Sequence, residues 1–418
     1  MSRGSSLFFH ADFRRLWAGD TASQFGSFVG NTAVPLLAAV TLAATPFEMG
    51  LLTAAETLAF LLLGLPAGVW VDRLSRRRVM LTADFTRFAL LLSVPIAWWA
   101  GVLTLAQLLV VVLLVGIATL FFDIAYQSYL PSLVGREHLL EGNAKLQAVQ
   151  SVAQIAGPSA AGVLVQLVTA ASTVLITGFG YLTSALFLLR IRAREPEPDR
   201  GPRTRLLPQI AEGLRFVFSD GPLRATVGTT GMANFFGGAF TAVYVLFLTR
   251  TVGLAPAAVG VLLAVSGAGG IVGALCSGAI TRRIGQARSI WLVPLCTLPG
   301  HLVLPLAASG WRLGLAGIGG AIGWFGITIY NVAAVSYRQA ICPDRLLGRM
   351  NASVRFVVWG VIPLGGLLGG ALGEGLGLRG ALWVAVAGEV AAVLWVVCSP
   401  LRHMRDLPTE AKSGSPAA

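Results

Sequence analysis

The sequence predicts an all-α integral membrane protein, with twelve transmembrane helices in two six-helix bundles. Apolar residues make up 55% of the 418 residues and charged residues only 12%, whereas soluble domains average about 25% charged. Apolar runs of about 20 residues recur, and each is long enough to cross a bilayer as a helix. Residues 46–73 also recur without a gap 210 positions later.

The repeat relates the two halves of the chain position by position. Its matching residues are Pro46, Gly50, Leu52, Ala54, Leu65, Gly68 and Arg73, which align with Pro256, Gly260, Leu262, Ala264, Leu275, Gly278 and Arg283. Each copy is an apolar run that ends in arginines. Halves with the same charge pattern indicate parallel repeats about an axis along the membrane normal, an architecture typical of transporters.

The first half supplies six apolar runs separated by short polar connections. The predicted spans are 17–43, 48–71, 79–100, 103–126, 143–168 and 172–192. Asp12 and Arg14 precede the first span without a cleavage site, so this segment reads as a cytoplasmic tail and not as a removed signal peptide. Arginines gather in every second connection, at 73–78 and at Arg136.

The second half repeats this organisation. Its predicted spans are 223–249, 256–281, 288–309, 312–337, 351–374 and 379–401. The connections at 190–224, 282–288 and 338–349 are rich in arginine, and the alternate ones carry only Arg250, Arg312 and Arg379. The positive-inside rule therefore predicts that both termini are cytoplasmic.

These spans define four segments. Residues 1–192 form the N-terminal bundle, 193–222 a cytoplasmic linker, 223–401 the C-terminal bundle and 402–418 a cytoplasmic tail predicted to be disordered. Within the linker, apolar residues recur at helical spacing, at Leu206, Ile210, Leu214 and Val217. Two interpretations stay open: an amphipathic helix on the inner leaflet, or an ordinary helix packed on the loops.

Composition excludes several other classes. The net charge of +12 is spread over short loops between spans, which indicates membrane orientation and no nucleic-acid partner. Neither of the two lysines follows a glycine, so no phosphate-binding loop is possible. The four cysteines and four histidines lack metal-site spacing, and no catalytic triad can be placed at one depth. We therefore expect no metal, no cofactor and no enzymatic activity.

Acidic residues inside the spans are the informative ones, because a charge in the bilayer is costly and usually functional. Glu56 lies about two turns into the second span, where the repeat has Ser266, and is a candidate to carry a coupling proton. Asp20 and Glu389 are weaker candidates for the same role. The alternatives are a structural, hydrogen-bonded acid for Glu56, a position at the membrane interface for Asp20 and a peripheral helix for Glu389. Asp84 and Arg87 are three positions apart and are interpreted as a structural pair.

The connection between the second and third spans carries a recognisable motif. Residues 68–78, Gly-Val-Trp-Val-Asp-Arg-Leu-Ser-Arg-Arg-Arg, resemble the loop signature G-x-L-x-D-R-x-G-R-R of the major facilitator superfamily. Trp70 and Ser75 depart from that pattern. The matching residues are Gly68, Asp72, Arg73, Arg76 and Arg77. A second, weaker resemblance is to the antiporter signature G-P-x-x-G-G, at Gly157, Pro158 and Gly162, where Ala161 replaces one glycine.

Further segments resemble the branch of enterobactin exporters and macrolide-efflux-like proteins. They include 13–17, 23–26, 122–134, 143–144, 212–216 and 343–349. The resemblance implies the major facilitator fold and alternating access around a central cavity. It also implies a latch at the cytoplasmic side, in which Asp72 meets the start of the eleventh span and Arg349 or Arg355, while Arg73 or Arg76 pairs with Asp123. Arginines that only set topology are the alternative.

The function implied is proton-coupled export of a hydrophobic or amphipathic small molecule from a bacterial inner membrane, by a protein expected to be a monomer. Drugs, antibiotics and siderophore-like natural products are candidate substrates. Candidate cavity residues are Phe25, Asn31, Asn234, Phe235, Tyr244, Trp324, Tyr330, Asn331 and Trp359. The alternatives are a proton-coupled nutrient uptake symporter and, less favoured, a membrane protein without transport activity. Uptake would be favoured by several convergent polar groups, which the sequence does not reveal.

Overall fold

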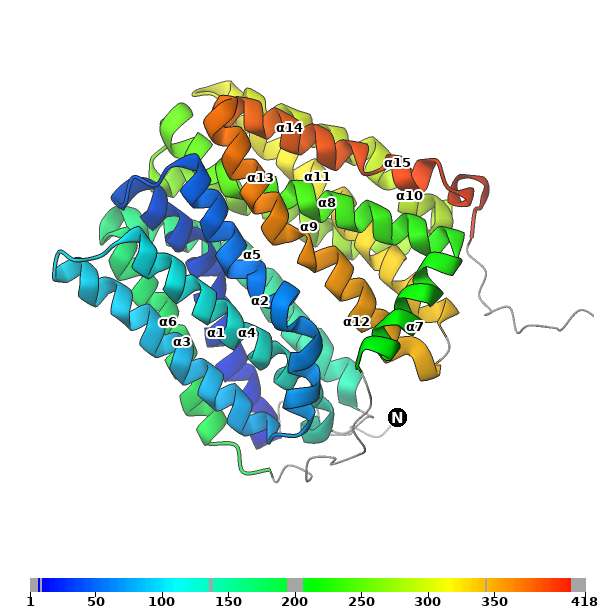
Figure 1. Cartoon of the computed structure of the whole chain (residues 1–418), viewed down its shortest axis with the longest axis horizontal. Coiled ribbons are helices and arrows are strands. Elements are labelled where there is room, and N and C mark those ends of the chain that lie inside the picture. Colours follow the sequence, from blue (N-terminus) through cyan, green and yellow to red (C-terminus); the bar gives the residue numbers. More distant parts are fainter. Residues whose placement is uncertain (1–6, 8–9, 135–137, 194–205, 343, 407–418) are drawn as a thin grey trace, which may run out of the picture. The chain divides into compact units, whose positions relative to one another are not determined.

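The structure is a computed structural model that describes Leu7 and residues 10–134, 138–193, 206–342 and 344–406. Within these residues all regular structure is helical (Figure 1). The first half contains α1 (Ala11–Leu36), η2 (Leu37–Thr41), α2 (Pro46–Asp72), α3 (Arg76–Trp99), α4 (Leu105–Val134), α5 (Leu139–Leu167) and α6 (Ala170–Leu189). The segment α7 (Leu206–Ser219) lies within the expected linker. Of the expected tail, residues 402–406 are described and 407–418 lie outside the described residues.

The second half contains α8 (Gly221–Leu246), η4 (Phe247–Thr251), α9 (Pro256–Ile284), α10 (Gln286–Thr297), η5 (Leu298–Leu306), α11 (Trp311–Ile341), α12 (Asp344–Gly360), α13 (Ile362–Gly375), α14 (Gly377–Ala391), α15 (Leu394–Val397) and η6 (Pro400–His403). Over the described residues, eleven helical stretches are long and apolar enough to cross a membrane. The first helix, α1, is more polar, but its 26 residues give a length of about 39 Å at 1.5 Å per residue. These helices make the chain a multi-pass membrane protein.

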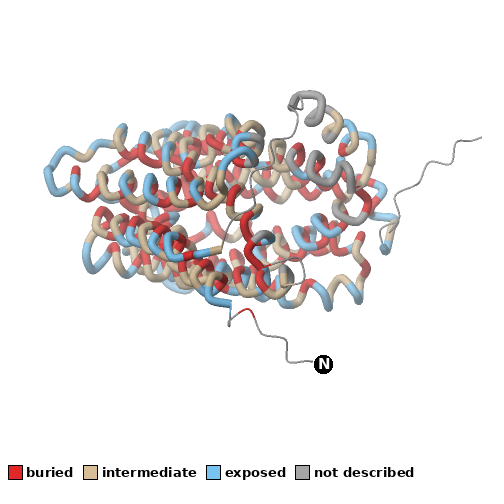
Figure 2. Tube along the Cα trace, turned by 90° about the horizontal axis from the view of Figure 1, so that it is seen from below, coloured by how far each residue is buried: buried red, intermediate tan, exposed pale blue. Residues whose placement is uncertain are grey.

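Contacts divide the chain into two compact units. Unit 1 comprises residues 1–203 together with 248–264, and unit 2 comprises 204–247 together with 265–418. Within unit 1, α1 packs against α5 and α6, α3 packs against α4 and α6, and α2 packs against α4. The buried residues of each helix alternate with exposed ones along the tube in Figure 2, as expected where only one stripe of a helix faces its neighbours.

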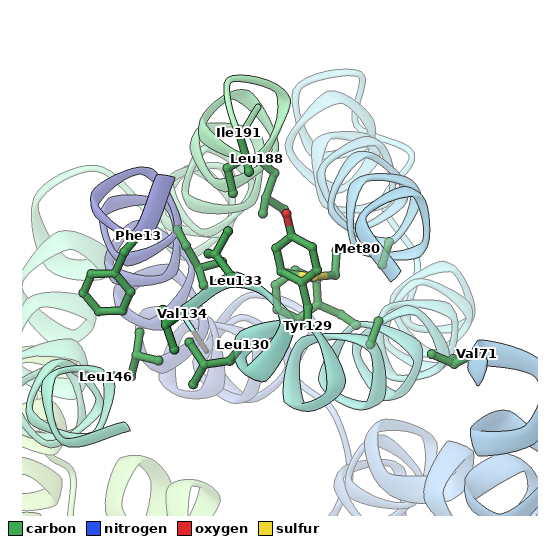
Figure 3. Close-up of a cluster of buried hydrophobic side chains, with 14 of the residues drawn as sticks. Phe13, Val71, Met80, Tyr129, Leu130, Leu133, Val134, Leu146, Leu188 and Ile191 are labelled. Atoms are coloured by element: carbon green, nitrogen blue, oxygen red, sulfur yellow. The ribbon is translucent and has the colours of Figure 1, made fainter. Parts of the chain in front are cut away.

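The core of unit 1 explains why its fourth helix outlasts the predicted span. The apolar run weakens near residue 126, yet α4 continues to Val134. Tyr129, Leu130 and Leu133 in this extension are at most 8% exposed, packed in a cluster that includes Phe13 and Met80 (Figure 3). Burial of these side chains stabilises two extra helical turns beyond the apolar run.

Glycines set the close packing within unit 2. Gly365 and Gly369 of α13 lie against the backbone of α8, so that a Cβ at either position would overlap the carbonyl of Phe235 or Ala239. Small residues at helix contacts allow backbones to approach in membranes, where burial of apolar surface gives little driving force. Gly365 and Gly369 therefore form a packing surface for α8.

The repeat is visible in the backbone beyond the residues that match. The wide-turn helical segments η2 and η4 end α1 and α8 at positions 210 apart. Two residues after each of these segments the backbone adopts a positive φ, which is 51° at Ala43 and 76° at Gly253. The same turn is thus built with glycine in one copy and with alanine in the other, which places strain on Ala43.

Span nine departs from the predicted continuous helix. After α10 the chain continues as the nine-residue 3₁₀ segment η5. Pro299 and Pro305 explain the change, because proline cannot donate a backbone hydrogen bond and its ring clashes with the preceding turn of an α-helix. The result is a span whose helix type changes from α to 3₁₀ part-way along its length.

Candidate functional site

A polar pocket lies inside unit 1, where α1, α4 and α5 meet. Its lining residues are Asp20, Gln24, Tyr126, Asn143, Ala144, Leu146, Gln147 and Gln150. The cavity volume is about 480 Å³, within the range of about 300–1,000 Å³ typical of small-molecule sites. One carboxylate, one phenol and four carboxamides face this space, so the pocket can hold a ligand through several hydrogen bonds.

Helical spacing positions each polar side chain. Asp20 and Gln24 are four residues apart on α1, and Nε2 of Gln24 lies 3.5 Å from Oδ1 of Asp20. On α5, Asn143, Gln147 and Gln150 recur at i, i+4 and i+7 and therefore share one face. Asp20 is only 4% exposed, so its side chain is buried among the helices of the unit.

The other two predicted coupling acids lie elsewhere. The Glu56 side chain is exposed on α2, and an exposed mid-span carboxylate is tolerated where it faces a water-filled cavity rather than lipid. Glu389 of α14 is buried in unit 2, where its Oε2 lies 3.0 Å from Nδ1 of His301. The predicted pair Asp84–Arg87 is an ion pair in α3, and both residues are buried.

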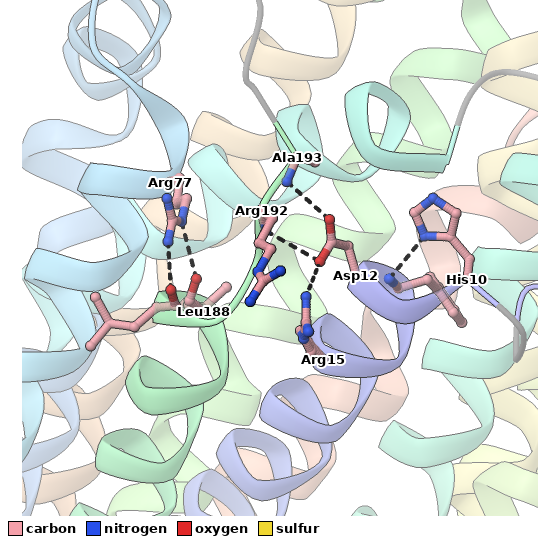
Figure 4. Close-up of polar contacts among 9 residues, drawn as sticks. His10, Asp12, Arg15, Arg77, Leu188, Arg192 and Ala193 are labelled. Carbon is pink, nitrogen blue, oxygen red and sulfur yellow. Dashed lines mark hydrogen bonds and ion pairs between the residues drawn. The ribbon is translucent and has the colours of Figure 1, made fainter.

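The arginines of the loop motif bind backbone carbonyls of unit 1. The Arg77 guanidinium donates to the carbonyls of Leu188, at 3.0 Å, and Leu189, at 2.8 Å (Figure 4). Arg76 donates to the carbonyl of Ser128 at 3.3 Å. Since the last carbonyls of a helix lack intrahelical donors, Arg77 caps the end of α6.

The structure describes only some of the other residues expected to form the latch. Arg73 is exposed and Asp123 is partly buried. The Arg355 guanidinium lies 4.8 Å from the centroid of the Trp359 ring. The side chains of Asp72 and Arg349 lie outside those that the structure describes. Around Gly68 there is open space, since a Cβ there would meet nothing within 4 Å.

Asp12 anchors the chain where it leaves α6. Its carboxylate accepts hydrogen bonds from the backbone N–H groups of Arg192, at 3.2 Å, and Ala193, at 2.9 Å, and from Arg15 at 2.5 Å (Figure 4). Burial raises the pKa of Asp12, but these hydrogen bonds outweigh it and hold the pKa below its usual value of 3.8. Asp12 therefore links the start of α1 to the segment that follows α6.

The antiporter-like residues form close helix contacts in unit 1. A Cβ on Gly157 would overlap Phe28 of α1, and one on Gly162 would overlap the carbonyl of Pro256. Reciprocally, Gly260 lies against the carbonyl of Pro158. Gly260 belongs to the repeated motif, so the two sequence signals meet at one contact between α5 and the part of α9 that clusters with unit 1.

The aromatic and amide residues predicted for a cavity are not among those that line the polar pocket. The Tyr330 hydroxyl donates to the carbonyl of Thr226 at 2.8 Å, and Asn234 donates to that of Val358 at 2.6 Å. Tyr244 is buried and stacks on Phe240 with centroids 4.4 Å apart. Phe235 packs edge-on to Phe236, Phe25 is partly buried, and four residues are exposed: Asn31, Trp324, Asn331 and Trp359.

Sequence reasoning missed the residues that complete the pocket, namely Gln24, Tyr126, Asn143, Gln147 and Gln150. One signal was present: Asn143, Gln147 and Gln150 fall at helical spacing on one face of a predicted span. It could have indicated a polar face, although not which other helix supplies the carboxylate.

Helices long and apolar enough to cross a membrane, together with the family match over nearly the whole chain, show that this protein is a transporter of the major facilitator superfamily and not an enzyme. More narrowly, the chain belongs to the transmembrane secretion effector family, which matches residues 4–417.

Several relatives resemble the chain over most of its length. The multidrug efflux pump Tap of Mycobacterium tuberculosis is 29% identical over 377 residues, covering 86% of this chain and 84% of its own. The enterobactin exporter EntS of Escherichia coli is 27% identical over 364 residues, covering 82% and 81%.

Solved structures resemble the fold. A bacterial homologue of the iron transporter ferroportin has a TM-score of 0.75 at 13% identity, with 93% of this chain and 98% of the other covered. The nucleoside transporter NupG has a TM-score of 0.72 at 12% identity, with the same coverage. At such low identity the likeness concerns the major facilitator fold alone.

Proposed function

We propose that this protein exports small amphipathic molecules in exchange for protons, by alternating access, across a bacterial cell membrane in which both termini are cytoplasmic. The polar pocket around Asp20 carries this proposal. A single buried carboxylate surrounded by carboxamides suits a molecule that presents a cationic or hydrogen-bond-donating group. The names of the relatives support export and a substrate of drug or siderophore type.

Exchange follows from competition for one carboxylate. A proton and a cationic group of the substrate neutralise Asp20 in different ways, so the binding of one disfavours the binding of the other. Release of substrate on one side and of the proton on the other then couples the two movements. Glu56, the leading candidate from the sequence, and Glu389 stay candidates for a coupling role, and the monomer remains the proposed state.

The arginine-rich loop supports the proposed conformational cycle. Arg76 and Arg77 donate to carbonyls of unit 1, and Arg73 is exposed. In the proposed latch, Asp72 meets Arg349 or Arg355, while Arg73 or Arg76 pairs with Asp123. Such a charge cluster would close the cytoplasmic side and break when the cavity opens there. An Asp72→Asn variant is expected to insert normally and transport poorly, and unchanged efflux would remove the latch role.

The test uses a strain that lacks the gene, complemented with variants and challenged with antibiotics and siderophores, with and without a protonophore. We expect the wild-type chain to lower accumulation of at least one compound and the protonophore to abolish the effect. Asp20→Asn should lose gradient-driven export and Gln147→Ala should weaken it. Gln127→Ala, an exposed amide on α4, is the matched control and should export normally.

Two results would contradict the proposal. Accumulation that neither gene deletion nor the protonophore changes would exclude proton-driven export of the compounds tested. Full gradient-driven export by Asp20→Asn would show that the pocket carboxylate carries no coupling proton. Glu56→Gln in the same assay tests the other candidate in the first half.

A second candidate function is proton-coupled uptake, because the pocket does bring several polar groups together. Direction distinguishes the two. Inverted membrane vesicles accumulate an exported compound when a proton gradient acid inside is imposed, whereas right-side-out vesicles accumulate an imported one. We expect accumulation in the inverted vesicles.

A further inference from the structure

Two titratable side chains from different spans meet inside unit 2. Nδ1 of His301, in η5, lies 3.0 Å from Oε2 of Glu389, in α14, although the residues are 88 positions apart. Their side chains are only 7% and 11% exposed. Acids and histidines buried within spans are rare and usually functional, because their charged forms are costly there.

The residues around the pair leave space for its two side chains. Nε2 of His301 is buried and has no hydrogen-bond partner among the described residues. It lies against Gly323 of α11, where a Cβ would overlap the imidazole ring. On the other side, a Cβ on Gly237 of α8 would lie 3.4 Å from Oε1 of Glu389. Glycines from two neighbouring helices thus make space for the two polar groups.

The backbone that carries His301 is the nine-residue 3₁₀ segment η5. Stretches of this helix longer than about four residues are uncommon, and within a span they often mark a hinge. His301 therefore sits on a backbone segment of the kind that often serves as a hinge.

The repeat provides an internal comparison. In unit 1 the third span, α3, packs against the sixth, α6, and the polar pair buried at this interface is Asp84–Arg87. In unit 2 the corresponding ninth and twelfth spans pack through His301 and Glu389. An arginine cannot lose its proton in a protein, whereas a histidine can gain and lose one. At this interface the first half buries a fixed ion pair within α3, and the second half buries a pair that joins two spans and can change its charge.

Other titratable groups on the packed elements have different contacts. From α14, Arg379 donates to the carbonyl of Ala307 at 3.3 Å. From α11, the Tyr330 hydroxyl bonds to Thr226 of α8 at 2.8 Å, and Tyr337 lies 3.4 Å from the Asp220 carboxylate. Tyr244 of α8 stacks on Phe240. Over residues 206–342 and 344–406, no ion pair joins His301 or Glu389 to a third charged side chain.

We propose that the His301–Glu389 pair is a proton-binding site of unit 2, and that its proton occupancy sets how the 3₁₀ segment packs on α11. A neutral imidazole whose Nδ1–H donates to the Glu389 carboxylate accepts one proton at Nε2. The product is an imidazolium paired with a carboxylate, in which Nε2–H is a new donor facing Gly323. An unsatisfied buried donor is destabilising, so η5 moves until that donor finds an acceptor.

Two conservative variants separate titration from packing. In Glu389→Gln the amide oxygen can still accept from Nδ1–H, and in His301→Asn the amide N–H can still donate to the carboxylate. Each keeps the hydrogen bond and cannot form the imidazolium–carboxylate pair. Glu374→Gln, an exposed acid on α13, is the matched control.

The test is nitrogen-15 NMR of the histidine-labelled full chain in lipid nanodiscs, between about pH 5 and pH 8, the range in which histidine changes charge. His301→Asn identifies the His301 signal by its loss. We expect that signal to change across the range in the wild type and in Glu374→Gln, and not to change in Glu389→Gln. A wild-type His301 signal that is constant over the range, or an unaltered change in Glu389→Gln, would overturn the proposal.

The role of the His301–Glu389 site in transport rests on the proposed function. A second assay tests the site and the proposed function separately. With ethidium as probe in proteoliposomes, Glu389→Gln should retain exchange without a gradient and lose gradient-driven accumulation. Wild-type proteoliposomes that do not move the probe, together with a titrating His301, would count against the proposed function and leave the proton site standing. Full gradient-driven accumulation by Glu389→Gln would remove the site from coupling.

Discussion

Replacing Arg87 with methionine is expected to destabilise the first bundle strongly. The guanidinium is 2% exposed and paired with the buried Asp84. It lies 4.3 Å from the centroid of the Phe122 ring and 4.1 Å from that of Tyr181, so α3 is joined to α4 and α6 through one cation.

The magnitude follows from these contacts. Two desolvated cation–π contacts are worth about 2 kcal/mol each, and breaking a buried ion pair on one side costs about 3–5 kcal/mol. Because both figures include the same buried charges, they overlap, and we expect a loss of about 3–5 kcal/mol for Arg87→Met. Replacing Asp84 with leucine as well should recover at least half of that loss, since no buried charge is then left unpaired.

The assay is reversible unfolding of the purified chain in mixed micelles titrated with sodium dodecyl sulfate, followed by circular dichroism. Arg78→Met, an exposed arginine near the start of the same helix, should change the free energy of unfolding by less than about 0.5 kcal/mol. A loss below about 1 kcal/mol in Arg87→Met, or a double variant as unstable as the single one, would refute the reasoning.

Three more predictions concern local structure. Ala43→Gly should raise the unfolding free energy by up to about 1 kcal/mol, because the left-handed conformation disfavours alanine by about 1–2 kcal/mol and the added chain entropy of glycine offsets part of the gain; an apparent melting temperature equal to or below wild type would contradict this. The pKa of Asp12 is lowered on folding, so the stability that its carboxylate contributes is present above about pH 4 and is lost as pH falls through the lowered folded-state pKa. Thermal unfolding in acid should therefore show a smaller loss of stability in Asp12→Asn than in wild type. Equal losses in the two proteins would contradict this prediction. Gly369→Leu should reduce the yield of monodisperse protein on size exclusion, since its side chain would collide with the backbone at Ala239, whereas Gly375→Leu, next to open space, should not.

The fold was largely predictable and the pocket was not. Hydropathy located the spans because each one crosses the bilayer with its own backbone hydrogen bonds, which makes a span a local property of the sequence. Asp20 was recognised as an acid within a span, but its partners Gln147 and Gln150 lie on a helix more than 100 positions away. Spacing along one helix reveals which residues share a face, but it does not reveal which face of another helix packs against them.

The sequence by itself determined the membrane class, the two repeats and the positions of the spans, because all three depend on composition and local pattern. The family followed from motifs that are also contiguous. Only the tertiary structure decided that carboxamides surround Asp20, that Arg77 caps the end of α6 and that His301 meets Glu389. Each of these contacts joins separate helices, and the packing of side chains between helices is fixed by the whole bundle and by no single span.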